Sequence, residues 1–478
     1  MLLGASIPSV SGQCDREAKL KSVANIIPVT VAFCAVAGIM VLFFAVRGDH
    51  VVAATAAIDV LALMCFATGV LPHMTTAFLS IIAFMILNLA PAEVVFSAFT
   101  TGGIWLTISG LIIGAAITDT GLGKQVAAYI FCLTGTSYAR SIVLISVAGF
   151  LLGFLVPSTI PRVIIMMPVT ASLAAAMGFE RGSRGQIGLA AAAATSTLLP
   201  TYTVLTANLP TIVQAGALEA LYGIAPSYAN YLVAQLPSNI VRFAVILMVL
   251  LPFARNQRPE EPSPAAIAMG PVTAAQIRLL IVIGLAIALW ATDSMHRVSP
   301  AWIAMGAAAI ILWPPSGLLA SDAMKSKIDM TPVFFLAGVF SVSAVSHHVG
   351  LDTRIAEALV PQLHLSEGSA FWDLYAITGL STLLSHLVTA PAAPVVLAPL
   401  AGAMADASGL TIFSVGMAQI NGVATPILPY QAPPLIVAMA LTHIPIRILT
   451  RLCVTLAIAT FVLGVPFTYL WWSLIGLI

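Results

Sequence analysis

Residues 154–168 combine, within a very apolar stretch, the side chains best suited to binding a polar ligand. Pro157 and Pro161 interrupt the run, Ser158 and Thr159 supply hydroxyls, and Arg162 adds a positive charge. Proline removes a backbone donor and leaves a carbonyl unpaired inside a helix. Such a break is tolerated within a membrane only where protein or a water-filled cavity satisfies the freed groups. The stretch therefore predicts a discontinuous helix that forms part of a binding site.

Arg162 indicates the charge of that ligand. A guanidinium group binds a carboxylate or sulfate through two parallel hydrogen bonds. The alternative is a structural ion pair with an acid such as Asp59 or Asp119. Asp59 itself is either a functional intramembrane carboxylate or a partner of a neighbouring span.

A second interrupted run occupies residues 386–399, where Thr389 again precedes closely spaced prolines. Ser158 and Thr389 could contact substrate or a coupling ion, and the same positions also suit helix N-caps. His386 lies three residues before Thr389 and could hold a coupling proton, because histidine titrates near neutrality. The alternative for His386 is a polar packing role.

The composition places these stretches in a membrane. The 478 residues are 60% hydrophobic and 8% charged, with a mean hydropathy of +1.04, whereas soluble domains are about 25% charged. Apolar runs near 20 residues indicate helical spans rather than an outer-membrane barrel. The net charge of +1 gives no sign of a nucleic-acid partner, and the five scattered cysteines show no metal-ligand spacing. We therefore predict an all-α polytopic membrane protein.

Charged segments define the expected organisation. Lysines and arginines before the first span place the N-terminus in the cytoplasm, and Arg255 and Arg258 do the same for a central linker. Trp471 and Trp472 suggest an interfacial belt near a C-terminus on the outside, which implies an odd number of spans, about 11. The predicted parts are a cytoplasmic segment (1–23), a first transmembrane repeat (24–253), the linker (254–271) and a second transmembrane repeat (272–478).

The two halves repeat each other. Gly121-Leu122 and Gly350-Leu351 are separated by 229 residues, Pro168 and Pro399 by 231, and Leu199-Pro200 and Leu428-Pro429 by 229. Two inverted repeats, each with a discontinuous helix, are typical of secondary transporters. We further predict one re-entrant hairpin per repeat, the first with its polar tip at residues 134–140.

These landmarks resemble the divalent anion:sodium symporter family of the ion transporter superfamily. Members have a Ser-Asn-Thr motif ten residues before a proline in each repeat, which here corresponds to 158–160 and 389–391. The later loops of the family correspond to 208–210 and 432–434, and Thr120-Gly-Leu122 also matches. Both motif asparagines are replaced, by Thr159 and Ala390.

The resemblance implies a homodimer in the inner membrane that transports a small anion of the di- or tricarboxylate or sulfate class. Sodium is the favoured coupling ion, with proton coupling through His386 or anion exchange as alternatives; a cation/proton antiporter would favour acids in the broken helices. No nucleotide-binding loop, cofactor motif or catalytic constellation is evident, so we predict no enzyme. The predicted substrate-binding residues are Ser158, Thr159, Arg162, Asn208, Thr389, Gln431 and Pro433, and the predicted ion-coupling residues are Ser158, Thr389 and His386.

Overall fold

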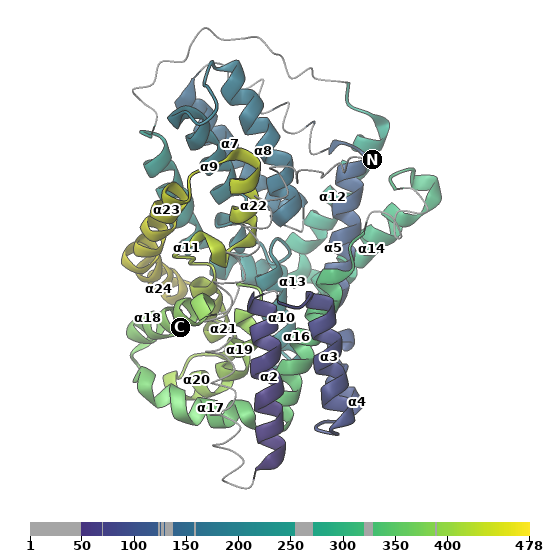
Figure 1. Cartoon of the computed structure of the whole chain (residues 1–478), viewed down its shortest axis with the longest axis vertical. Coiled ribbons are helices and arrows are strands. Elements are labelled where there is room, and N and C mark those ends of the chain that lie inside the picture. Colours follow the sequence, from purple (N-terminus) through teal and green to yellow (C-terminus); the bar gives the residue numbers. More distant parts are fainter. Residues whose placement is uncertain are drawn as a thin grey trace, which may run out of the picture.

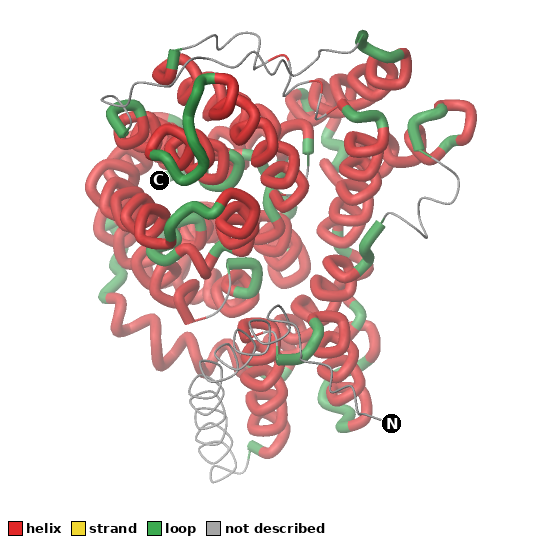
Figure 2. The backbone as a smooth tube through the Cα atoms, turned by 45° about the horizontal axis from the view of Figure 1, so that its top comes forward, coloured by secondary structure: helices red, strands yellow, loops and turns green. Residues whose placement is uncertain are grey.

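The computed structural model describes residues 49–253, 271–319 and 328–478, except 69, 123–124, 126–128, 130–136, 157–158 and 388–389. Within these ranges the chain forms helices and no strand (Figure 2). A helix satisfies its own backbone groups, which is the requirement inside a bilayer. The predicted all-helical class is confirmed. Residues 1–48, which comprise the N-terminal segment and the start of the predicted first repeat, lie outside the described residues, as does the linker up to residue 270.

The helices occur in the same order in both halves of the chain, with α denoting α-helices and η other helical turns (Figure 1). The first half contains α2 (His50–Thr68), α3 (His73–Ile86), α4 (Ala92–Val95), η1 (Ser97–Thr100), α5 (Gly102–Asp119), α7 (Tyr138–Leu155), α8 (Thr159–Ala176), α9 (Arg184–Ser196), η2 (Pro200–Thr203), α10 (Leu209–Tyr222) and α11 (Tyr228–Leu250). The second half contains α12 (Ala274–Ala291), α13 (Asp293–His296), α14 (Pro300–Leu312), η3 (Pro314–Ser316), α16 (Thr331–His348), α17 (Leu351–Leu359), η4 (Val360–Leu363), α18 (Ala370–Leu387), α19 (Ala393–Leu397), η5 (Ala398–Leu400), α20 (Ala401–Ser408), α21 (Ile412–Val423), η6 (Pro429–Gln431), α22 (Pro433–Thr442), α23 (Ile446–Ala459), η7 (Thr460–Gly464) and α24 (Val465–Leu474).

Several helices begin where a hydroxyl side chain accepts from a backbone N–H of the first turn. Ser137, Ser183, Ser227 and Thr411 each accept from the amide three residues later. Thr273 forms a reciprocal capping box at the start of α12. These bonds satisfy amides that have no intrahelical partner. The helix starts are thus determined locally by the sequence.

Five helices of the described chain are long and apolar enough to cross a bilayer: α5, α7, α11, α12 and the continuous segment Ile446–Leu474. A sixth candidate is α16 with the segment Leu351–Leu363, which are bent by 79°. The remaining apolar helices are shorter. The predicted total of about 11 spans therefore stays a prediction.

Helices α7 and α8 form an antiparallel hairpin. The Tyr138 ring at the start of α7 contacts the Phe179 ring just after α8, with centroids 5.9 Å apart. The Ser141 hydroxyl lies 3.6 Å from the Met177 sulfur. This hairpin turns between the end of α7 at Leu155 and the start of α8 at Thr159, whereas the sequence predicted the tip of the first hairpin at 134–140, of which residues 134–136 lie outside the described residues. The residue before a proline avoids helical geometry, and Val156 accordingly has ψ 105°.

Pro161 behaves differently from the prediction that it interrupts the helix. It lies in the first turn of α8, where the missing N–H has no intrahelical partner in any case. Pro157 lies outside the described residues, between the end of α7 and the start of α8. In the second half, α18 folds back on the α19–α20 segment, so that Glu367 before α18 lies against Gly409 after α20.

Contacts between the halves come in matched pairs. Helix α5 of the first half packs against α14 of the second (Figure 1). Helix α16, which holds the position of α5 in the second half, packs against α3, which holds the position of α14 in the first half. Helix α8 packs against α22, and α10 packs against α19. A Cβ on Gly338 of α16 would lie 2.5 Å from the Cβ of Ala77 in α3, so glycine permits this close approach.

Helix α9 lies at the centre of the helices that support the site. Its alanine run, Ala190–Ala194, is fully buried. Helices α7, α8, α11 and α22 all pack against α9. Small side chains let helix backbones approach closely inside a membrane. The alanine run therefore holds the α7–α8 hairpin close to the interrupted helical segment that follows α9.

Candidate functional site

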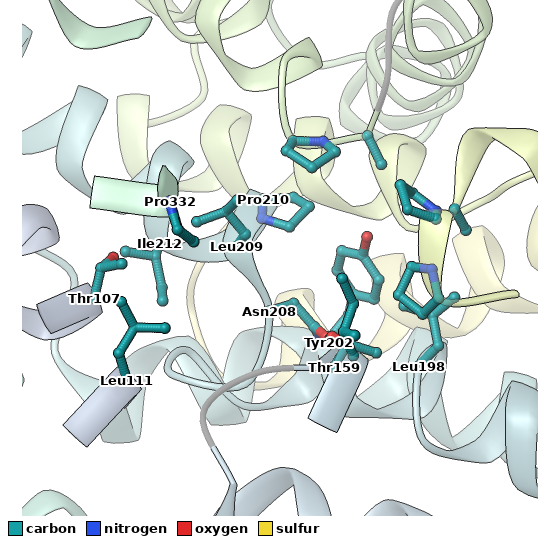
Figure 3. Close-up of a pocket in the computed structure, with 16 residues that line it drawn as sticks. Thr107, Leu111, Thr159, Leu198, Tyr202, Asn208, Leu209, Pro210, Ile212 and Pro332 are labelled. Carbon is teal, nitrogen blue, oxygen red and sulfur yellow. The ribbon is translucent and has the colours of Figure 1, made fainter. Parts of the chain in front are cut away.

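A cavity of about 170 Å³ lies where interrupted segments of both halves meet (Figure 3). Residues at or beside the starts of α8 and α10 line it from the first half. Residues beside the starts of α19 and α22 line it from the second half. The lining residues are Thr107, Leu111, Thr159, Ile160, Leu198, Tyr202, Asn208, Leu209, Pro210, Ile212, Pro332, Ala390, Pro391, Ala432, Pro433 and Pro434.

The four helix starts make the cavity electrostatically suited to an anion. A helix N-terminus presents unpaired N–H groups and the positive end of the helix dipole. Prolines in the first turns of α10, α19 and α22 are compatible with these starts because the amides they remove would have no intrahelical partner. The described lining includes no acidic side chain.

Arg162 lies behind this lining. Its side chain is fully buried, and its Nη2 donates to Thr159 Oγ1 and Asn208 Oδ1, both at 2.9 Å. The same nitrogen lies 3.0 Å from the carbonyl oxygen of Ala207 and 3.3 Å from Thr201 Oγ1. Arg162 is not among the lining residues, so it acts on the cavity through Thr159 and Asn208.

Polar groups of the lining come mainly from the first half. Thr159 Oγ1 donates to Asn208 Oδ1 at 2.7 Å, which joins the start of α8 to the start of α10. In Figure 3 the Tyr202 hydroxyl projects into the space between the helix starts. Tyr202 is not among the predicted substrate-binding residues. It lies in the polar segment 191–216, whose hydroxyl and amide side chains, Thr201 and Asn208 among them, indicate a cavity wall.

The predicted second-half residues have different positions. Pro433 lines the cavity. Gln431 does not: its Oε1 accepts from the amides of Ile427 and Leu428 at 2.8 Å, and its Nε2 lies 3.2 Å from the Ser385 carbonyl. Gln431 therefore fastens the loop before α22 to the end of α18.

His386 lies in the last turn of α18. Its Nδ1 donates to the Thr382 carbonyl at 2.6 Å, and its buried Nε2 has no hydrogen-bond partner among the described residues. His386 does not line the cavity. Ser158 and Thr389 lie outside the described residues, but their neighbours Thr159 and Ala390 both line the cavity.

Asp59 is occupied elsewhere. Its carboxylate accepts from Ser346 and so joins α2 to α16. Of the two interpretations of Asp59, pairing with a neighbouring span is the one that the structure shows. Within the described parts of the chain, Arg162 bonds to neutral oxygens, and the predicted alternative of an ion pair between Arg162 and Asp59 is not observed there.

A cavity at the meeting point of interrupted helices, inside an apolar helical chain, is the arrangement of a membrane transporter. The chain belongs to the family described as the sodium:sulfate symporter transmembrane region, whose model matches residues 25–478. This match confirms the resemblance to divalent anion:sodium symporters and the prediction that the chain is not an enzyme.

Curated relatives agree with this class. The chain is 24% identical to a membrane protein of Cupriavidus necator, over 80% of this chain and 76% of the relative. It is 23% identical to the inner membrane protein YbhI of Escherichia coli, over 80% and 82% of the two chains. It is 22% identical to the chloroplastic dicarboxylate transporter 2.2 of Arabidopsis thaliana, over 86% and 77%.

A solved structure shares the fold. The YdaH transporter of Alcanivorax borkumensis matches with a TM-score of 0.55 at 16% identity, over 80% of this chain and 88% of that one. The chain is therefore a membrane protein with a transporter fold.

Proposed function

We propose that this protein is a secondary active transporter of a small anion, most suitably a di- or tricarboxylate, with sulfate as the next candidate. The observation that carries the proposal is the convergence of four helix starts, two from each half, on one cavity backed by the buried charge of Arg162. Positive helix ends and a guanidinium both favour negative ligands. The similarity to a dicarboxylate transporter supports the same class.

The cavity size suits such a ligand. One water needs about 10–15 Å³ of such a cavity, so a cavity of about 170 Å³ has room for a small carboxylate or sulfate. Because much of the lining is proline, leucine and isoleucine, the few polar groups would orient the anion and the apolar walls would limit its shape.

The matched packing of the halves supports two inverted repeats. The contact of α5 with α14, matched by the contact of α16 with α3, is the pattern that two parts related by a two-fold axis would give. In this proposal the α7–α8 and α18–α20 hairpins enter the bilayer from opposite sides and turn back at the cavity. The protein would be a homodimer in the inner membrane, with the N-terminus and the central linker cytoplasmic and the C-terminus outside.

Thermal unfolding of the purified protein against a panel of solutes tests the proposal. Di- and tricarboxylates or sulfate should raise the midpoint, because a ligand that binds only the folded state stabilises it. Monovalent cations and neutral sugars serve as negative controls. Stabilisation by neutral solutes, with no response to any anion, would exclude anion transport.

Uptake into proteoliposomes then tests transport itself. Vesicles preloaded with the stabilising anion should accumulate the labelled anion from outside by exchange. Protein-free vesicles give the background. Binding without accumulation would identify an anion-binding protein rather than a transporter.

A further inference from the structure

A second cavity, of about 410 Å³, lies at the far ends of two helices whose starts line the anion cavity. Its walls are the end of α8 with the loop that follows, the first turn of α9, and the end of α22. The two halves of the chain therefore each supply a wall. The volume falls in the range of about 300–1,000 Å³ that is usual for small-molecule sites. We call this space, between residues 171–186 and 441–443, the α8–α22 groove.

Two basic side chains from different halves of the chain line one end of the groove. Arg181 lies in the loop after α8, and His443 directly follows α22. Both are exposed, and neither has an acidic partner in the described part of the chain. The exposed Glu180 does not belong to the lining. A guanidinium and an imidazole are both donors to phosphate oxygens, so this end of the groove favours an anion.

A buried amide side chain holds the two walls of this basic end together. Gln186 Oε1 accepts from the Gly182 amide at 3.1 Å, and Gln186 Nε2 lies 3.5 Å from the carbonyl oxygen of Thr442. Gln186 is 7% exposed. The loop that carries Arg181 is thereby joined to the residue before His443. A ligand between the two basic residues thus meets a site that is already formed, which lowers the entropic cost of binding.

The other end of the groove continues into an exposed apolar stripe along α8. The stripe consists of Ile160, Ile164, Pro168, Ala171 and Ala175, all of them exposed. Their spacing of three or four residues places them on one face of the helix. At 1.5 Å per residue the stripe is about 22 Å long. A free phosphate would use only the basic end, whereas a molecule with an anionic head and a hydrocarbon chain would use both.

The groove lies at the end of the protein that is predicted to face the cytoplasm. The guanidinium carbon of Arg184, three residues after Arg181, lies 5.1 Å from the ring centroid of Phe253. Phe253 directly precedes the linker that is predicted to be cytoplasmic. Anionic lipids give the cytoplasmic leaflet its negative surface potential, and basic pockets between helices on that side bind their head groups.

We propose that the α8–α22 groove binds one anionic phospholipid, with its phosphate between Arg181 and His443 and an acyl chain along the exposed stripe of α8. The inference goes beyond anion transport and does not depend on it. The bound lipid holds the far ends of α8 and α22 at a fixed spacing. Because residues at the starts of both helices line the anion cavity, the lipid stabilises the cavity from the membrane surface.

Thermal unfolding of the full-length protein in a neutral detergent tests the site, with dioctanoyl phosphatidylglycerol as the probe. The midpoint should rise and saturate with this lipid, because a ligand that binds only the folded state stabilises it. Dioctanoyl phosphatidylcholine has the same chains and no net charge, and it should give no saturable rise. Glycerol phosphate has the phosphate without the chains, and it should give none at the same concentrations.

Three variants separate the two ends of the groove from general surface charge. Arg181→Gln should weaken phosphatidylglycerol binding about fivefold, the usual effect of one basic residue near a membrane surface. Ala175→Trp fills the apolar end and should abolish the saturable rise while both basic residues remain. Arg140→Gln is the matched control, because Arg140 is an exposed arginine in the first turn of α7 that does not line the groove. Its affinity for the lipid should equal that of wild type.

A photoactivatable phosphatidylglycerol locates the lipid without any substitution. Mass spectrometry of the cross-linked wild-type protein should identify peptides that contain residues 171–186 or 441–443. Labelling confined to other helices would overturn the proposal, even if the Arg181 variant does not fold. Equal affinity of wild type and Arg181→Gln, or an equal response to phosphatidylcholine, would overturn it too. A full response to glycerol phosphate would make the groove a site for soluble phosphates and would reject the lipid.

Discussion

Asn208 and Asn239 provide a matched pair for testing the site. Each asparagine accepts a hydrogen bond from a fully buried arginine: Asn208 Oδ1 from Arg162 at 2.9 Å and Asn239 Oδ1 from Arg242 at 2.8 Å. Each side-chain amide also donates once more, at 3.2 Å and 2.8 Å. Only Asn208 of the pair lines the cavity. Replacing each by alanine therefore separates structural loss from loss of binding.

The expected destabilisation is similar for both variants. A buried hydrogen bond to a charged group contributes about 1.5–3 kcal/mol and a neutral one about 1 kcal/mol. Each substitution removes one of each kind, so each should cost about 2–4 kcal/mol of folding free energy. Asn208→Ala also removes the hydrogen bond from Thr159 at 2.7 Å, so its loss of folding free energy should lie at the upper end of that range.

The binding effects should differ. If Asn208 donates one hydrogen bond to the bound anion, Asn208→Ala weakens binding by about 10- to 150-fold, the equivalent of about 1.5–3 kcal/mol. With free ligand at about 100 times the wild-type Kd, ligand stabilisation is about 2.7 kcal/mol for wild type and about 1.4 kcal/mol after a tenfold loss. Asn239→Ala should retain the full ligand stabilisation.

Thermal unfolding with and without the stabilising anion measures both quantities in one experiment. Retention of the full ligand response by Asn208→Ala would refute the placement of the anion in this cavity. An equal loss in Asn239→Ala would show that the response reports general loosening of the helices around the buried arginines.

Three further predictions concern the walls, the packing and the orientation. Tyr202→Phe should leave stability nearly unchanged and weaken anion binding several-fold, because the hydroxyl projects into the cavity; an unchanged affinity would remove Tyr202 from the site. Gly338→Ala should destabilise the protein by about 1–3 kcal/mol through overpacking, because its Cβ would lie 2.6 Å from the backbone Cα of Ala77. The control Gly114→Ala, with nothing within 4 Å of its Cβ, should not destabilise it, and thermal midpoints compare the two. A C-terminal alkaline phosphatase fusion should be active, since the C-terminus is predicted outside; an inactive but expressed fusion would reverse the orientation.

The sequence by itself determined the class of the protein and most of its helices. Apolar runs near 20 residues can satisfy their backbone in lipid only as helices, and hydroxyl caps such as Ser137 and Ser183 define helix starts locally. It also located the end of α7 just before Pro157, because a proline restricts the backbone geometry of the residue before it, but it wrongly predicted that Pro161 interrupts the helix. Helices α5 and α16 begin at Gly102 and Thr331, which is the same offset of 229 residues, and the inverted repeats stay a prediction.

The tertiary structure decided which interruptions meet and which side chains face the cavity. Thr159, Asn208 and Pro433 line one cavity, and Arg162 lies directly behind Thr159 and Asn208. Gln431 and His386 make their hydrogen bonds outside the lining, and the binding roles of all these residues stay predictions. The pattern of residues along a helix does not specify its rotation about its axis when nearly all its faces are apolar. That rotation is set by packing against other helices, here by the buried alanine run of α9 and by the glycine contacts of α16.

The same reason explains the role of Arg162. Its type and burial follow from the sequence, and so does the expectation of a partner with negative charge or dipole. Its actual partners, Thr201, Ala207 and Asn208, come from a segment about 40 residues later, brought alongside by the packing of α8 on α9. Contacts between distant segments depend on how whole helices pack, and no local pattern in the chain encodes them.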